Sequence, residues 1–250
     1  MKVFYFTATG NSLMVAKSFG GEVYSIPKVM KSGNTSIEDD VIGFVFPCYR
    51  ASIPTVVEEF LSSIQLNASY TFAIMTYGNV ALGGTKQFID IAKQNGIKID
   101  YANQVKMVDN SLKHYDMEKQ IKGLVKKQVN KQIDVIKSDV ERKACNRGCG
   151  NVVIHQISKL GYQAYRKEIG DCDSLFEVES HCTLCKVCER VCPVDNIKVD
   201  GKVNFEGKCI RCYACTQNCP SNAIRFKGEK SKTRYRNFDI SLKEIIQANS

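Results

Sequence analysis

The stretch FYFTATGNS, residues 4–12, decides the fold that this sequence predicts. It starts inside an apolar run, residues 2–6 (KVFYF), which has the composition of a buried strand. The run then breaks into small hydroxyl residues and a glycine, and residues 11–19 continue with the pattern of a helix. We therefore expect a strand, a tight loop and a helix at the start of the chain.

The same alternation continues along the first half of the sequence. Short apolar runs recur at 23–26, 41–46, 70–76 and 97–108, and helical patterns lie at 55–64 and 85–95. Strands that alternate with helices in this way are typical of an α/β fold, a parallel sheet with helices on both faces. Residues 28–40 are the one connection without an evident helix, because Pro27 and Gly33 interrupt it.

The second half has a different pattern. Residues 117–143 predict one long charged helix, and residues 150–168 predict a second. The pair Asp200-Gly201 between apolar residues predicts a small hairpin. Residues 227–237 are basic and turn-like, and residues 242–248 predict a last short helix.

Length and composition favour two folded units joined by a linker. The chain has 250 residues, of which 44% are hydrophobic and 24% are charged, as in a protein with a substantial core. We expect a first domain over residues 1–112, a helical basic linker over 113–171 and a second domain over 172–250. No apolar run approaches the ~18 residues that span a bilayer, and no secretory signal is visible. The expected location is the cytoplasm.

The formal net charge of +9 is concentrated in residues 113–170, where Lys and Arg outnumber Asp and Glu. Such a basic stretch could meet nucleic acid or an acidic protein. Because neither interleaved aromatic residues nor a known nucleic-acid motif accompanies it, the solvated face of a lysine-rich helix is the favoured interpretation. We expect no nucleic acid among the partners.

The chain contains twelve cysteines, and a disulfide framework is not expected in a compartment that keeps thiols reduced. Residues 182–199 (CTLCKVCERVCPVDNIKV) align without gaps onto residues 209–226 (CIRCYACTQNCPSNAIRF). The two copies share four cysteines, the proline after the fourth and a later isoleucine. Zinc sites use pairs of CxxC elements, so the third cysteine at the same step favours a four-iron cluster.

This spacing, CxxCxxCxxxCP, resembles that of bacterial two-cluster ferredoxins over residues 176–227. In that family each motif gives three ligands to one [4Fe-4S] cluster and its last cysteine to the other. The resemblance implies electron transfer through two [4Fe-4S] clusters with two ligand sets. The first set is Cys182, Cys185, Cys188 and Cys219, and the second set is Cys209, Cys212, Cys215 and Cys192.

Several cysteines and histidines lie outside this pattern. They are Cys48, Cys145, Cys149, Cys172, His114, His155 and His181. Cys145, Cys149 and Cys172 could hold another metal, but no fourth ligand is evident, so buried or idle thiols are the favoured interpretation. The histidines show no ligand spacing.

The loop of residues 7–12 has the chemistry of an anion site. It presents hydroxyls and free backbone N–H groups, and the N-terminus of the following helix adds partial positive charge. Such a nest can hold a phosphate without Lys or Arg. Since the loop is neither GxGxxG nor GxxxxGK[ST], a dinucleotide or a nucleoside triphosphate is disfavoured. A hydroxyl-rich turn that only caps the helix is the alternative.

TxTGNS after a first strand is similar to the FMN phosphate loop of flavodoxins, and residues 1–110 resemble that fold as a whole. The resemblance implies the sheet order 2-1-3-4-5, with the flavin at the carboxyl ends of the strands. The stretches FPCYRASIP (residues 46–54) and TYGNVALGGT (residues 76–85) follow the third and fourth strands, where flavin loops are expected. The residues implied to bind FMN are Thr7, Thr9, Gly10, Asn11, Ser12, Pro47, Cys48, Tyr49, Arg50, Ala51, Thr76, Tyr77, Gly78, Asn79, Gly83 and Gly84.

The two halves together resemble flavodoxin-ferredoxin fusion proteins of anaerobic bacteria. The resemblance implies an electron transfer protein that serves redox partner proteins, because clusters move single electrons and FMN accepts one or two. A homodimer is left open. The alternative is an FMN-dependent reductase of a quinone or nitro compound, although no acid-base pair in the flavin loops supports it. A redox-sensing regulator that binds nucleic acid rests on charge alone.

Overall fold

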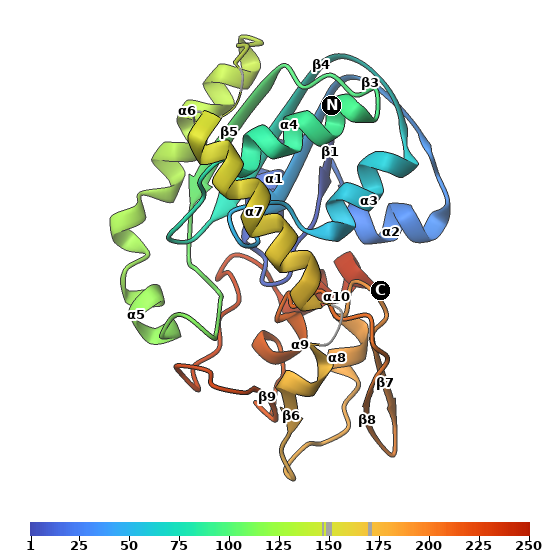
Figure 1. Cartoon of the computed structure of the whole chain (residues 1–250), viewed down its shortest axis with the longest axis vertical. Helices are drawn as coiled ribbons and strands as arrows, with labels where there is room; N and C mark the ends of the chain where they lie inside the picture. The colour runs from blue at the N-terminus through green and yellow to red at the C-terminus, as the bar shows by residue number, and fades with distance from the viewer. Residues whose placement is uncertain (147, 149–151, 170–171) are drawn as a thin grey trace.

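The first half of the chain forms a five-stranded parallel sheet in a computed structural model that describes residues 1–146, 148, 152–169 and 172–250. The strand order is β2-β1-β3-β4-β5, which confirms the predicted α/β fold and its order (Figure 1). The strands are β1 (Lys2–Tyr5), β2 (Glu22–Ser25), β3 (Ser36–Pro47), β4 (Gln65–Tyr77) and β5 (Tyr101–Lys106). All four pairings are parallel, so the carboxyl ends of the strands lie at one edge.

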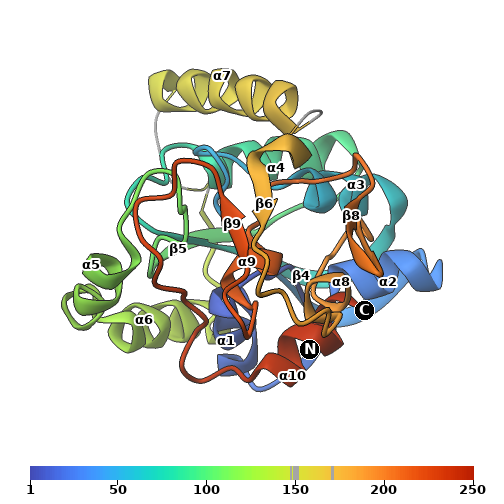
Figure 2. The same cartoon turned by 90° about the horizontal axis from the view of Figure 1, so that it is seen from below.

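Helices cover both faces of this sheet. They include α1 (Asn11–Ser18), α3 (Thr55–Ser63), α4 (Gly84–Gln94), α6 (Val129–Glu141) and α7 (Val152–Ile169). Figure 2 shows α3 and α4 on one face, with α7 outside them, and α1 and α6 on the other face. Because both faces are covered, the later halves of the central strands β3 and β4 are largely apolar, and side chains such as Phe44, Phe46 and Phe72 are fully buried.

The connection between β2 and β3 contains a helix, α2 (Ile26–Ser32), which corrects the expectation of an irregular segment over residues 28–40. Pro27 lies in its first turn, where a missing N–H costs nothing. Gly33 ends the helix with φ of 69°, a left-handed conformation that suits glycine. The residues that suggested an interruption therefore begin and end a short helix.

The expectation of a single long helix over residues 117–143 is also wrong. The structure divides it into α5 (Met117–Lys122), a 3₁₀ turn η1 (Val125–Lys127) and α6. Gly123 ends α5, and Gln128 precedes α6 in a left-handed conformation with φ of 48°. The break lets Ile133, Ile136 and Val140 of α6 reach the sheet while α5 turns toward the carboxyl edge.

The remaining chain forms a small cysteine-rich region below that edge (Figure 1). Its elements are η2 (Asp173–Leu175), β6 (Phe176–Val178), α8 (Val187–Arg190), β7 (Ile197–Asp200), β8 (Lys202–Phe205), α9 (Ala214–Gln217) and β9 (Ile224–Phe226). Strands β7 and β8 form the hairpin predicted at Asp200-Gly201, and β6 pairs with β9, also antiparallel. The rings of Phe176, Tyr213 and Phe226 pack against one another in tilted or edge-on arrangements.

The end of the chain returns to the sheet region. Helix α10 (Leu242–Asn249) is the short helix predicted from the sequence, and Lys17 Nζ binds Glu244 Oε1 at 2.8 Å across its surface. Before it, the N–H of Asn237 donates to the Thr9 carbonyl at 2.7 Å. The first loop of the sheet region is therefore covered by one of the last segments of the chain. No helix among the described residues is long and apolar enough to cross a membrane.

Candidate functional site

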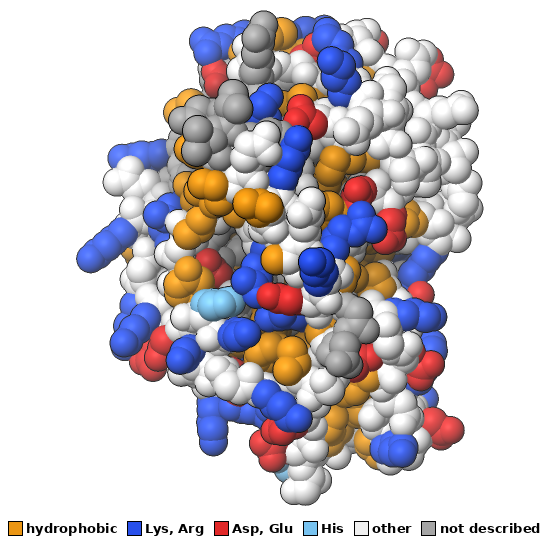
Figure 3. Space-filling model, viewed as in Figure 1, with side chains coloured by type: hydrophobic (Ala, Val, Ile, Leu, Met, Phe, Trp, Pro, Cys, Tyr) orange, Lys and Arg blue, Asp and Glu red, His pale blue; other side chains and the backbone are white. Residues whose placement is uncertain are grey.

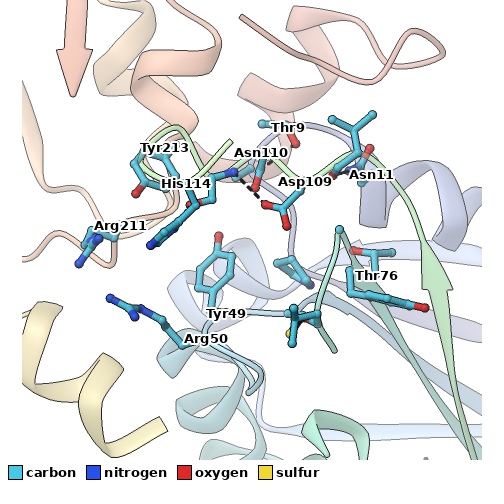
Figure 4. A pocket seen from close by; sticks show the side chains of 18 of the residues that line it. Thr9, Asn11, Tyr49, Arg50, Thr76, Asp109, Asn110, His114, Arg211 and Tyr213 are labelled. Atoms are coloured by element: carbon cyan, nitrogen blue, oxygen red, sulfur yellow. Dashed lines mark hydrogen bonds between the residues drawn. The ribbon is translucent and has the colours of Figure 1, made fainter. Parts of the chain in front are cut away.

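A cavity of about 360 Å³ lies between the carboxyl edge of the sheet and the cysteine-rich region (Figure 4). Loops after β1, β3, β4 and β5 form most of its wall, and α7 and the loop before α9 close it. Ligand pockets typically fall in the range of ~300–1,000 Å³ and at this position in an open α/β sheet. The fold thus places a ligand-sized space where the parallel strands end.

Most residues implied by the flavodoxin resemblance line this cavity. They are Thr7, Thr9, Asn11, Ser12, Pro47, Cys48, Tyr49, Arg50, Ala51, Thr76, Tyr77 and Gly78. The other four implied residues, Gly10, Asn79, Gly83 and Gly84, are not among those that line the cavity. Gly10 precedes α1 with φ of 94° and lies close to Asn237 and Ile240 near the end of the chain. The N–H of Asn79 donates to Asp109 Oδ2 at 3.1 Å. Gly83 and Gly84 begin α4, where the Gly83 N–H donates to Ser158 Oγ at 2.8 Å.

The structure adds lining residues that the sequence did not indicate. They are Ala8, Val80, Val108, Asp109, Asn110, Ser111, His114, Tyr115, Tyr165, Glu168, Arg211 and Tyr213. The segment 108–115 follows β5 as the other loops follow their strands, so strand order alone could have indicated it. Tyr165, Glu168, Arg211 and Tyr213 come from α7 and the cysteine-rich region, and only tertiary packing brings them here.

The loop of residues 7–12 is buried and firmly held. Ser12 Oγ lies 2.9 Å from Thr76 Oγ1, Asn11 Nδ2 donates to the Val108 carbonyl at 3.1 Å, and Asn110 Nδ2 donates to Thr9 Oγ1 at 3.1 Å. Helix α1 begins within this stretch, at Asn11, and no side chain among the described residues caps its first turn. Uncapped N–H groups at a helix start are suited to an anion.

Tyr49 occupies the middle of the cavity. Figure 4 shows its ring pointing inward, toward His114 and Asn110. Its hydroxyl is shielded from water and has no hydrogen-bond partner among the described residues. The ring stands edge-on to Phe6 and Tyr165, with centroid distances of 6.2 and 5.9 Å. Burial raises the pKa of Tyr49 well above its usual value, and the nearby Cys212 and Tyr165 add to this effect.

Glu168, at the end of α7, joins two arginines at the mouth of the cavity. Its carboxylate lies 2.5 Å from Arg50 Nη2 of the sheet region and 2.5 Å from Arg211 Nη1 of the cysteine-rich region. Burial works to raise the pKa of Glu168, but the hydrogen bond and charge of Arg50 and the charge of Arg211 outweigh it, so this pKa is lowered. The pKa of His114 is lowered by burial and by the charges of Arg50 and Lys113.

The internal repeat is also visible in the backbone. Leu184, Lys186 and Asp195 have left-handed φ values of 54°, 61° and 51°, and the matching residues of the second copy have 54°, 62° and 55°. Those matching residues are Arg211, Tyr213 and Asn222. Non-glycine residues rarely adopt this conformation, so its repetition at matched positions marks two loops shaped for the same purpose.

Each loop brings thiols close to one another. Burial raises the pKa of Cys188 to about 12, and the neighbouring Cys219, Cys182 and Cys185 contribute. Burial likewise raises the pKa of Cys212 to about 12, with Cys192 as a neighbour. Backbone N–H groups donate to two matched sulfurs, from Asn196 to Cys192 at 3.2 Å and from Ala223 to Cys219 at 3.3 Å.

The thiols of each set do not converge on a single point. In the described part of the chain, no three His, Cys, Asp or Glu side chains are placed to hold one metal ion.

The cysteines outside the repeat have separate surroundings. Cys48 lines the cavity, with its Sγ 3.6 Å from the Val80 carbonyl, and Cys145 is exposed beside Lys143. Cys172 is buried against Cys209. Cys149 lies outside the described residues, as does the side chain of His155. His181 Nε2 lies 3.1 Å from the Ser221 carbonyl.

Comparison with protein families identifies one matching family, and its two matches lie in the cysteine-rich region. The family model of the 4Fe-4S binding domain matches residues 177–198 and 203–225, one match for each copy of the repeat. The comparison with curated proteins gives no match. The C-terminal region therefore carries 4Fe-4S ferredoxin motifs, and the N-terminal region is a parallel sheet of order 2-1-3-4-5.

Proposed function

We propose that the chain is an electron transfer flavoprotein that passes electrons between two [4Fe-4S] clusters and FMN, and onward to a redox partner protein. In this proposal it resembles flavodoxin-ferredoxin fusion proteins, with a sheet domain over residues 1–112, a linker over 113–171 and a ferredoxin-like domain over 172–250. The observation that carries the proposal is the shared wall of the cavity. Arg211 and Tyr213 line it, and Cys212 stands between them in the sequence.

The FMN phosphate is assigned to the loop of residues 7–12 and the start of α1. The loop offers hydroxyls and the uncapped N-terminus of an eight-residue helix, which favours an anion without a cationic side chain. The loop is rigid before any ligand arrives, because Thr9, Asn11 and Ser12 are hydrogen-bonded to neighbouring loops. Such preorganisation lowers the entropy lost on binding.

The flavin ring is assigned to the space around Tyr49, bordered by residues 47–51 and 76–79. Support comes from the hydroxyl of Tyr49, which has no hydrogen-bond partner over residues 1–146, 148, 152–169 and 172–250. A buried polar atom without a partner costs about 1–3 kcal/mol, and a polar ligand edge could relieve that cost. FMN would supply a centre that takes one or two electrons, whereas the clusters pass one at a time.

The second ligand set, Cys209, Cys212, Cys215 and Cys192, is assigned to the cluster that faces the cavity. Cys212 is close enough to Tyr49 to raise the pKa of the phenol. The first set, Cys182, Cys185, Cys188 and Cys219, is assigned to the cluster that faces the surface, because Cys185 is exposed. Electrons would thus cross the cysteine-rich region from one face to the other.

The redox partner is proposed to be a protein with an acidic docking face. Figure 3 shows Lys and Arg side chains along the edge of the molecule that α5 and α6 form in Figure 1. Charge complementarity of this kind raises association rates and weakens as salt screens it.

Anaerobic purification with cofactor analysis tests the proposal. We expect about eight iron atoms and one FMN per chain, the iron following from two four-iron clusters. Cys212→Ala should lose about four iron atoms and keep FMN, and its FMN should be reduced more slowly by a protein donor that delivers electrons to the first cluster. A chain that binds no flavin, or whose flavin is reduced equally fast without the second cluster, would contradict the proposal.

A second candidate is an FMN-dependent reductase of a small organic acceptor, such as a quinone or nitro compound. The observation in its favour is that His114, Asp109 and Tyr213 line the cavity. They bring proton donors and acceptors to a site whose predicted flavin loops contain no acid-base pair. Steady-state assays separate the two functions. Rapid multiple turnover of such an acceptor would support the reductase, and equilibration with redox proteins alone would support the carrier.

A further inference from the structure

Cys172, which the sequence left without a role, lies at the second ligand set. Its side chain is 2% exposed, and its Sγ donates to the Cys209 carbonyl oxygen at 3.1 Å. A fifth thiol therefore touches one of the four residues assigned to that cluster.

A network of hydrogen bonds holds Cys172 in this place. The next residue, Asp173, accepts from Asn196 Nδ2 at 2.8 Å and from the Gly207 N–H at 2.6 Å. The N–H of Asn196 in turn donates to Cys192 Sγ at 3.2 Å, so the same network reaches the ligand set from a second side. The segment that carries Cys172 is thus fixed to the loop that carries Cys209.

The neighbour of Cys172 is also the most accessible member of the second set. Cys209 is half-buried, whereas Cys192, Cys212 and Cys215 are buried. Cys209 lies two residues after Gly207, an exposed glycine that turns the chain with φ of 77°. Solvent and chelators would reach its sulfur before the other three.

We infer that Cys172 is a reserve ligand of the second [4Fe-4S] cluster, able to take the place of Cys209. In the exchange, the bond between Cys209 Sγ and iron breaks and a bond between Cys172 Sγ and the same iron forms. The proton that Cys172 loses passes to the sulfur of Cys209, and no electron is gained or lost. This inference rests on the proposed second cluster.

The internal repeat supplies a matched control. Cys182 occupies in the first copy the position that Cys209 occupies in the second. Of the described cysteines outside the two sets, Cys48 lies against Val80 and Cys145 beside Lys143, so Cys172 is the described one that contacts a ligand of either set. The two ligand positions should therefore respond differently to the same substitution.

The test is the iron and sulfide content of anaerobically purified variants. We expect about eight iron atoms per chain for Cys209→Ala, as in the unchanged chain, and about four for Cys182→Ala. The double variant Cys209→Ala with Cys172→Ala should also fall to about four. EPR of the reduced protein should show two [4Fe-4S] clusters in Cys209→Ala.

Iron loss in Cys209→Ala equal to that in Cys182→Ala would overturn the inference, as would about seven iron atoms with the EPR signal of a three-iron cluster. If Cys209→Ala does not fold, Cys172→Ala decides, since it keeps all eight assigned ligands. It should lose iron to a chelator several-fold faster than the unchanged chain, and an equal rate would reject the reserve role. Fewer than about eight iron atoms in the unchanged chain would instead reject the proposed pair of clusters.

Discussion

At the scale of single residues, two tyrosines that line the cavity, Tyr49 and Tyr165, differ in their hydrogen bonding. The Tyr49 hydroxyl is buried and has no hydrogen-bond partner in the part of the chain that the structure describes, while the neighbouring Tyr165 hydroxyl donates to the Ile210 carbonyl at 3.1 Å. A buried polar group without a hydrogen bond destabilises a fold, whereas one with a partner contributes about 1 kcal/mol. The two tyrosines therefore have opposite expected effects on stability, although both face the same space.

We predict that Tyr49→Phe raises the free energy of unfolding of the flavin-free protein by about 1 kcal/mol, because the unpartnered hydroxyl is removed. Tyr165→Phe, the matched control, should lower it by about 1 kcal/mol. Urea denaturation followed by circular dichroism measures both. Equal losses in the two variants would show that the Tyr49 hydroxyl has a partner within the fold.

The place of residues 7–12 at the carboxyl edge of the sheet could be predicted from the sequence, because strand, loop and helix are adjacent there and local rules apply, whereas their binding of FMN stays a prediction. The same holds for residues 47–51 and 76–78, which follow apolar strands. Tyr165 and Arg211 could not be predicted in this way. Nothing in their own neighbourhoods indicates a cavity, and only the packing of α7 and the cysteine-rich region on the sheet places them there.

At the scale of elements, α7 depends on a close approach to the loop after β3. A Cβ added at Gly161 would lie 2.6 Å from the Arg50 carbonyl oxygen, a backbone atom that cannot move without its loop. We predict that Gly161→Ala destabilises the fold by about 1–3 kcal/mol, the usual cost of overpacking, despite the better helix propensity of alanine.

Gln163→Ala on the exposed side of α7 is the control for Gly161→Ala, and it should leave the free energy of unfolding within about 0.5 kcal/mol. Chemical denaturation measures both variants. A neutral or stabilising Gly161→Ala would mean that α7 does not press on the loop as described.

Helix α10 begins with a capping box in which Ser241 and Glu244 exchange hydrogen bonds. Lys17 and Ser241 bind the carboxylate of Glu244 and lower its pKa from 4.5 to about 2. A lowered pKa in the folded state stabilises the fold above pH 4.5, and this contribution is lost as the pH falls from about 4.5 to about 2.

We predict that Glu244→Gln removes this part of the acid sensitivity. The difference in urea midpoint between the unchanged chain and the variant should be largest at pH 7 and should shrink steadily below pH 4.5. Lys17→Met removes the ion pair from its other side and should reduce the same pH dependence in part. A difference that does not change between pH 7 and pH 2 would contradict the assignment.

The elements themselves were predictable to the extent that their periodicity was uninterrupted. Helices α1, α3 and α4 lie close to the expected ranges, whereas β3 and β4 each begin five residues before the apolar runs at 41–46 and 70–76, because their first residues are polar. Helix α2 does not follow from the pattern, because Pro27 and Gly33 can mark either a break or the two ends of a helix, and here proline lies in the first turn and glycine at the helix end. The break between α5 and α6 was missed because apolar spacing continues through Gln128, whose left-handed backbone leaves no trace in a hydrophobic pattern.

At the scale of the whole molecule, the chain end supports the loop at which it began. Tyr235 Oη donates to Asn11 Oδ1 at 2.8 Å, and Asn237 Nδ2 donates to the same oxygen at 3.2 Å. Asn249 Nδ2 reaches the Thr7 carbonyl at 3.4 Å. No local signal in the sequence connects these residues to a loop more than half the chain away, so this support was not predictable.

We predict that Asn237→Ala weakens FMN binding about tenfold, equivalent to about 1.4 kcal/mol, because the loop of residues 7–12 loses part of its support. The iron content should stay unchanged, since the cysteine loops are not touched. Asn204→Ala in the β7–β8 hairpin is the control and should bind FMN normally. Fluorescence titration of the flavin-free protein measures affinity, and an unchanged affinity in Asn237→Ala would refute this role.

The return of α10 and residues 235–240 to the first loop has a consequence for synthesis. Ribosomes add roughly 5 to 20 residues per second, so roughly 10 to 50 seconds separate the emergence of Thr9 from that of Asn237. During that interval the nascent sheet lacks the segment that seals its first turn. Maturation is therefore ordered in time, and the cavity acquires its final form only after both cysteine loops have left the exit tunnel.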